Sequence, residues 1–159
     1  SATETRYAIV KSSLPTSYLG LNTQISYKNW DFAISGHGSF GNYMYNFVTA
    51  DQYVQSVYSD QGSYSNILQA TKDTGFQTQQ LYSDYFLEDA SFFRIDNISL
   101  GYTFPKLWNN SSSLRLTFGV QNVAVFTGYS GIDPEIYSGI DREVYPRPRT
   151  YSFSANLTF

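Results

Sequence analysis

The chain has 159 residues, of which 42% are hydrophobic and only 14% charged, and its formal net charge is −3. This balance excludes the basic surface stripe that nucleic-acid binding requires, and the absence of Cys excludes disulfides and thiolate metal sites. No apolar run of about 18 residues is present, which excludes a transmembrane helix but not a transmembrane β-barrel, whose strands are only half apolar.

Aromatic residues are unusually frequent, with 15 Tyr and 12 Phe but a single Met. Tyr suits the boundary between membrane and water because its ring is apolar and its hydroxyl is polar. The composition therefore fits a protein that meets both environments.

Two segments near the start alternate in polarity with period two, which is typical of a strand with two different faces. They cover residues 17–27 and 30–40, and the two-residue turn at 28–29 joins them. His37 falls on the polar face of the second strand. We expect no catalytic triad and no metal site at His37, because the chain offers no other His and no Cys as a partner.

Three further strands are predicted over residues 93–104, 113–123 and 149–159, again with one apolar and one polar face. Within the first of them, the apolar side chains occupy odd positions before Asp96 and even positions after Asn97. Such a change of register predicts either a β-bulge near Asp96-Asn97, because one extra residue moves the following side chains to the opposite face, or a strand that leaves the membrane zone there.

The connections between the predicted strands alternate in length. Residues 28–29 and 105–112 are short, whereas 41–92 and 124–148 are long. Outer-membrane barrels combine short periplasmic turns with long extracellular loops. The pattern therefore predicts an all-β fold, namely a transmembrane antiparallel β-barrel with its C-terminus facing the periplasm. Five strands that begin outside the cell cannot close, so we expect only the C-terminal strands of a larger barrel, with no plug domain.

A soluble β-sandwich also shows period-two alternation, so a carbohydrate-binding sandwich is retained as an alternative. Strands of about 9–11 residues, apolar faces without charge and aromatic residues at the strand ends favour the barrel. An outer-membrane barrel without TonB coupling is the second alternative.

Several runs resemble the SusC-like and RagA-like TonB-dependent transporters of Bacteroidetes. They are residues 27–31 (YKNWD), 38–42 (GSFGN), 92–105 (FFRIDNISLGYTFP), 119–122 (GVQN), 129–135 (YSGIDPE), 145–151 (YPRPRTY) and 156–159 (NLTF). The stretch from about 43 to 90 is the part without a match.

The resemblance implies one domain over residues 1–159 that belongs to a plugged barrel of about 22 strands. It also implies import of glycans or oligopeptides across the bacterial outer membrane, with no enzymatic activity and no cofactor. The implied partners are a SusD-like surface lipoprotein, the remainder of the same barrel with its plug, TonB acting through that plug, and outer-membrane lipid.

Candidate functional residues fall into two groups. Tyr151, Phe153 and Phe159 resemble the C-terminal signal by which the outer-membrane insertion machinery recognises a barrel; the alternative is a simple girdle of aromatic residues. Tyr43, Tyr45, Tyr129 and Tyr137 are predicted to lie in the long loops, where they could contact substrate or the lid protein. Packing within the loops is the alternative for each of these tyrosines.

Charged residues in the last loop give weaker signals. Asp133 with Glu135, and Asp141 with Glu143, are paired carboxylates, but nothing in the sequence separates their pKa values as a glycosidase requires. Arg142, Arg147 and Arg149 could meet anionic groups, lipopolysaccharide or the lid protein, or could cap the strand end.

Overall fold

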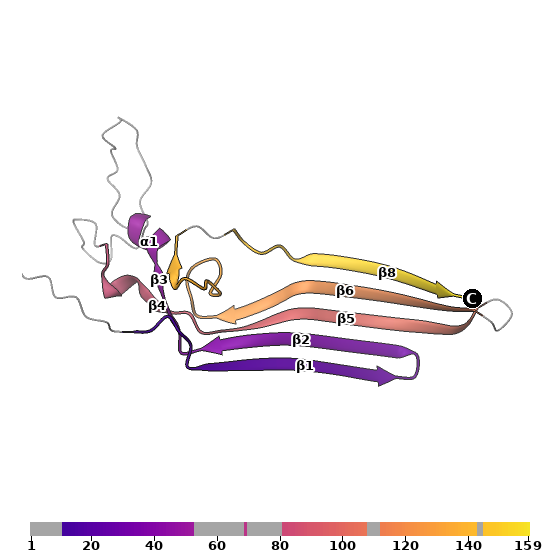
Figure 1. The fold of residues 1–159 in the computed structure, drawn as a ribbon. Coiled ribbons are helices and arrows are strands. Elements are labelled where there is room, and N and C mark those ends of the chain that lie inside the picture. The colour runs from indigo at the N-terminus through magenta and orange to yellow at the C-terminus, as the bar shows by residue number, and fades with distance from the viewer. Residues whose placement is uncertain (1–10, 53–68, 70–80, 108–111, 143–144) are drawn as a thin grey trace, which may run out of the picture.

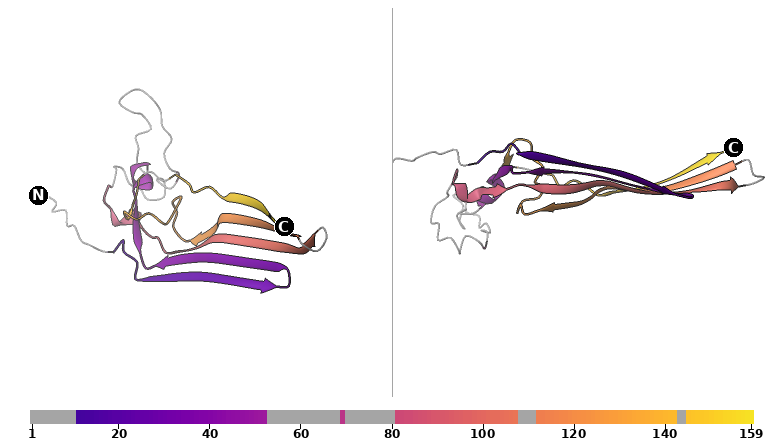
Figure 2. Two further views of the ribbon diagram at one scale, coloured as in Figure 1. Left: turned by 45° about the vertical axis from the view of Figure 1, so that its right-hand side comes forward. Right: turned by 90° about the horizontal axis from the view of Figure 1, so that it is seen from below.

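Five long antiparallel strands form one twisted sheet, shown face-on in Figure 1 and edge-on in the right-hand view of Figure 2. The computed structural model describes residues 11–52, 69, 81–107, 112–142 and 145–159. Across the sheet the strands are β1 (Ser17–Tyr27), β2 (Trp30–Phe40), β5 (Phe92–Leu107), β6 (Ser112–Thr127) and β8 (Thr150–Thr158). The turn at 28–29 and the C-terminus lie at one end, the turn end. The other end is called the loop end.

Smaller elements gather at the loop end (Figure 1). A second sheet pairs β3 (Tyr43–Asn46) with β4 (Leu87–Asp89) in antiparallel fashion and with β7 (Ile140–Asp141) in parallel fashion. The helix α1 (Phe47–Gln52) follows β3, and the 3-10 helix η1 (Asp84–Phe86) precedes β4. None of the helices in the described ranges is long and apolar enough to cross a membrane.

Strand pairing places the apolar side chains of all five strands on one face of the large sheet. One row on this apolar face consists of Tyr27, Trp30, Tyr102, Leu116 and Ala155. The neighbouring row, on the polar face, consists of Ser26, Asp31, Gly101, Thr117 and Ser154. On the apolar face, Ile25 is 58% exposed, Phe118 48% and Phe153 70%. A continuous apolar face of this kind marks a surface that meets another apolar phase or a partner.

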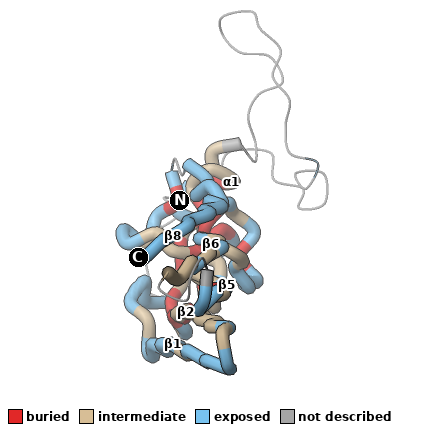
Figure 3. The backbone as a smooth tube through the Cα atoms, turned by 90° about the vertical axis from the view of Figure 1, so that its right-hand side faces the viewer, coloured by how far each residue is buried: buried red, intermediate tan, exposed pale blue. Residues whose placement is uncertain are grey.

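The hydrophobic core lies at the loop end and not under the large sheet. Met44, Ala90 and Tyr129 form a buried cluster against which Ile136 packs. The edge strands β1 and β8 are exposed along nearly their whole length (Figure 3). Within the described residues no second sheet is paired face to face with the large one, as a soluble sandwich would require.

The bulge predicted at Asp96-Asn97 is confirmed. The pairing of β5 shifts between Ile95 and Asn97 on the β6 side, and Ser35 and Gly36 of β2 are offset in the same way. Gly36 is required there, because a Cβ atom at this position would lie 2.6 Å from the backbone oxygen of Arg94. The bulge turns Arg94 onto the polar face, directly opposite His37.

Strand bounds agree with the sequence analysis at β1 and β2, which cover the predicted residues 17–27 and 30–40. Strands β5 and β6 are 16 residues long and extend beyond the predicted 93–104 and 113–123. Their hydrogen-bonded ladder continues past the apolar zone as far as Phe92 and Thr127. The predicted loop over 41–92 contains short elements of its own, and β7 lies within the predicted loop over 124–148.

Candidate functional site

A buried ion pair fastens the segment after β6 to the polar face of the sheet. Arg94 Nη2 lies 2.6 Å from Asp133 Oδ1, and the two side chains are only 4% and 6% exposed. Arg94 Nη1 also donates to Asn122 Oδ1 at 2.8 Å. Desolvation makes a buried pair costly to form, but removing one partner leaves an uncompensated buried charge. The pair therefore holds the segment 128–141 in a defined position.

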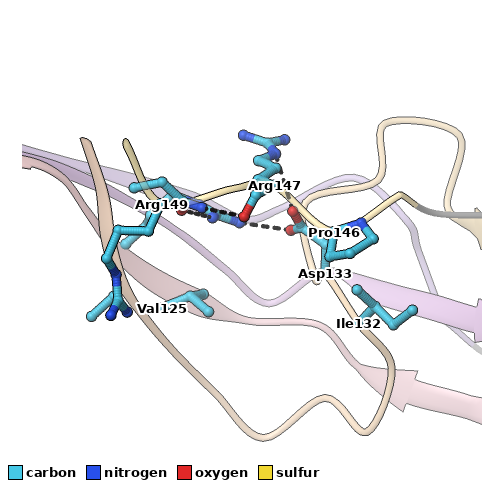
Figure 4. A pocket seen from close by; sticks show the side chains of 9 residues that line it. Val125, Ile132, Asp133, Pro146, Arg147 and Arg149 are labelled. Atoms are coloured by element: carbon cyan, nitrogen blue, oxygen red, sulfur yellow. Dashed lines mark hydrogen bonds and ion pairs between the residues drawn. The ribbon is translucent and has the colours of Figure 1, made fainter. Parts of the chain in front are cut away.

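Arg147 adds a second cation from the segment that leads into β8. Its Nε lies 3.0 Å from Asp133 Oδ2, and its Nη1 lies 2.9 Å from Glu135 Oε2. Figure 4 shows Arg147 and Asp133 facing each other. The Glu135 carboxylate also approaches Arg94 Nε at 3.3 Å, so the two acidic residues share the two guanidinium groups.

The neighbouring arginines do not enter this network. Arg149 Nη2 donates to the backbone oxygen of Val123 at 2.7 Å, and Arg142 lies over the ring of Phe47 at 5.0 Å from its centroid. Asp141, the other acidic residue of the loop, accepts a hydrogen bond from Tyr129. Glu143 lies outside the described residues.

His37 completes the charged cluster, which we define as His37, Arg94, Asp96, Asp133, Glu135 and Arg147. His37 Nδ1 lies 2.7 Å from Asp96 Oδ2, and Nε2 lies 3.4 Å from Glu135 Oε1. The sequence analysis did not anticipate these two contacts, which arise because the bulge at Asp96 and the returning loop both bring carboxylates to His37. In the described part of the chain, no three His, Cys, Asp or Glu side chains are arranged to hold a metal ion.

A cleft of about 350 Å³ opens above the charged cluster, between the segment that precedes β1 and the loop around Tyr137. His37, Glu135 and Arg147 supply its charged lining, and Tyr18 and Tyr137 supply aromatic rings. Pockets for small ligands in proteins are of this size and combine apolar walls with a few polar groups.

The four tyrosines predicted as contact residues have different environments. Tyr137 is 106% exposed, whereas Tyr129 is buried and donates its hydroxyl hydrogen bond to Asp141 Oδ2 at 2.8 Å. Burial, together with this bond to Asp141, raises the pKa of Tyr129. The Tyr43 hydroxyl accepts from Lys11 Nζ at 3.2 Å, and the Tyr45 hydroxyl accepts from the Tyr82 backbone at 2.9 Å. Contact with substrate or a lid stays a prediction for all four, and Tyr137 is the most accessible of them.

The three C-terminal aromatic residues lie at the edge of the sheet. Tyr151 and Phe153 stand opposite Val120 and Phe118 on the apolar face of β8. Phe159 follows the end of β8 and is almost fully exposed.

The arrangement defines a class of protein. One exposed apolar face, one polar face, a tight turn at one end and folded loops at the other are the features of a wall segment of a transmembrane β-barrel.

Comparison with known proteins shows homology to TonB-dependent receptors. The chain is 38% identical, over 89% of its length, to the TonB-dependent receptor SusC of Bacteroides thetaiotaomicron, and spans 15% of that protein. It is 25% identical to the TonB-dependent receptor P3 of Formosa agariphila, over 95% of this chain and 17% of that protein. No protein-family model matches the chain. The chain is thus homologous, over most of its length, to the SusC/RagA-like TonB-dependent receptors, which are transporters and not enzymes.

Solved structures show the same fold. The chain superposes on the RagAB peptide importer in its open-open state with a TM-score of 0.74 at 20% identity, over 97% of this chain and 19% of that one. The closed-closed state gives a TM-score of 0.71 at 19% identity, over 96% and 18% of the two chains. The five-stranded sheet therefore corresponds to part of a larger antiparallel structure.

Proposed function

We propose that this chain forms part of the barrel wall of an outer-membrane, TonB-dependent importer of glycans or oligopeptides. The apolar face of the large sheet meets lipid, and the polar face lines the lumen. The loop end lies outside the cell and Phe159 lies on the periplasmic side. The exposed apolar face carries this proposal, because it extends across all five strands and bears no charge.

The proposed importer requires parts beyond this chain. Among the described residues, no strand pairs with the outer edge of β1 or of β8, and lipid does not tolerate the unpaired backbone groups left there, so further strands of the same barrel pair with both edges. A plug that contacts TonB fills the lumen. We also propose a SusD-like surface lipoprotein as a lid, since the similar RagAB importer is known in open-open and closed-closed states. In assembly, Tyr151, Phe153 and Phe159 act as the signal for the insertion machinery.

The test begins with the native membrane species that contains this chain. Purification in detergent is expected to yield a polypeptide far longer than 159 residues, together with a surface lipoprotein. Deleting the gene of this polypeptide is expected to abolish uptake of a glycan or oligopeptide, and deleting the gene of TonB is expected to abolish uptake of the same substrate. A species of only this length that stays soluble without detergent would refute the proposal and favour the carbohydrate-binding sandwich.

Tyr137 is the residue we propose for contact with substrate or lid, because it is fully exposed beside the cleft. Replacing it by Ala is expected to weaken substrate binding to the full-length importer by about 2-fold to 10-fold, the value of one aromatic contact. Isothermal titration with glycans and oligopeptides measures the change. Tyr145→Ala is the matched control, since Tyr145 is also exposed but does not line the cleft, and an equal loss in both variants would contradict the assignment.

A further inference from the structure

His37 lies between two carboxylates that come from different parts of the chain. Asp96 belongs to the bulge of β5 and faces Nδ1 at 2.7 Å, whereas Glu135 belongs to the loop after β6 and faces Nε2 at 3.4 Å. A neutral imidazole carries a proton on only one nitrogen, so it would direct a lone pair at one of the two carboxylates. Only the doubly protonated ring can donate to Asp96 and also present a positively charged N–H to Glu135, whose 3.4 Å contact is that of an ion pair.

The surrounding charges favour the same state. Three elements place charged side chains around His37. Strand β5 contributes Arg94 and Asp96, and the loop after β6 contributes Asp133 and Glu135. The segment before β8 contributes Arg147. The residue of β1 opposite His37 is Gly20, which has no charge. Three carboxylates thus meet two guanidinium groups, and a protonated His37 supplies the missing positive charge. A partly buried cluster is most stable when its charges balance.

The two contacts of His37 have different strengths and different structural roles. The contact with Asp96 is short and joins neighbouring strands β2 and β5, which the ladder already holds together. The contact with Glu135 is longer and joins the wall to the loop. Loss of the second proton therefore affects the loop more than the strands.

We propose that His37 is a proton-operated latch for the loop over residues 128–141. With two protons, the ring attracts Glu135 and adds to the contacts of Arg94 and Arg147 that keep the loop closed beside the cleft. With one proton, the ring keeps Asp96 and loses its attraction for Glu135, so the loop opens more often although the two arginines still hold it. The closed loop holds one proton more than the open loop, so by mass action a fall in pH favours closure and a rise in pH favours opening. Its effect on uptake rests on the proposed importer function, but the latch itself does not.

Hydrogen exchange of the loop in the full-length membrane protein tests the latch between about pH 5.5 and 8, where His titrates and carboxylates stay ionised. After correction for intrinsic exchange, protection of residues 128–141 is expected to fall on the order of threefold to tenfold as the pH rises. His37→Gln is expected to give low protection at both pH values, and His37→Arg, which keeps a positive charge, high protection at both.

Two results would overturn the latch: a wild-type loop whose protection does not change with pH, or a His37→Gln variant that retains the wild-type change. Because exchange is read without any transport assay, either result leaves the importer function untouched. Conversely, a protein that shows the pH response but no TonB-dependent uptake would retain the latch and refute the importer.

Discussion

Replacement of Arg94 by Met is expected to release the loop over residues 128–141 from the wall. Asp133 is nearly fully buried and would lose its 2.6 Å partner. Leaving one charge of a buried pair without its partner costs about 3–5 kcal/mol. The remaining contact of Asp133 with Arg147 places the expected cost near the lower end of that range. Hydrogen exchange of the loop in the full-length protein measures the local free energy of opening.

Two variants make this test specific. Arg115→Met removes the ion pair with Asp31, which has the same 2.6 Å length, but the Arg115 side chain is 50% exposed. The local free energy of opening is therefore expected to fall by only about 0–1 kcal/mol. The double variant Arg94→Met with Asp133→Leu removes both buried charges and is expected to recover most of the protection, because apolar residues of similar size can replace a buried pair. Equal effects of Arg94→Met and Arg115→Met would show that burial does not decide the strength of the contact.

Much of the wall could be predicted because its physical determinants are local. Side chains of a strand alternate between two faces, so one buried or lipid-facing surface leaves a period-two pattern in the sequence. This pattern located β1 and β2, and the change of parity at Asp96-Asn97 located the bulge. The ends of β5 and β6 were placed too early, because backbone pairing continues where the apolar alternation stops.

The charged cluster could not be predicted in the same way, because its members are far apart in sequence. His37 and Asp96 are 59 residues apart, and Arg94 and Asp133 are 39 apart. Pairing of β2 with β5 brings the first two together, and the return of the loop after β6 supplies Asp133 and Glu135. One usable signal was present: the strands carry very few charges, so Arg94 and Asp96 within β5 required partners.

An Arg at position 118 is expected to be among the most destabilising single substitutions in the large sheet. Phe118 lies on the apolar face of β6, between Leu100 and Phe153 of the neighbouring strands. A positive charge on the lipid-facing side near the middle of a membrane costs about 2–4 kcal/mol. Reversible unfolding of the full-length protein from lipid vesicles measures the free energy of Phe118→Arg relative to wild type.

Thr117→Arg is the matched control, one residue away on the opposite face. Thr117 stands between Gly101 and Ser154, whose small side chains leave room for a long one, and the proposed lumen is aqueous. We therefore expect Thr117→Arg to cost much less than Phe118→Arg. If the apolar face met water instead, Phe118→Arg at this half-exposed position would cost little free energy. The difference in cost between Phe118→Arg and Thr117→Arg would then disappear or change sign. The sign of this difference therefore reports which solvent covers the apolar face, independently of any transport measurement.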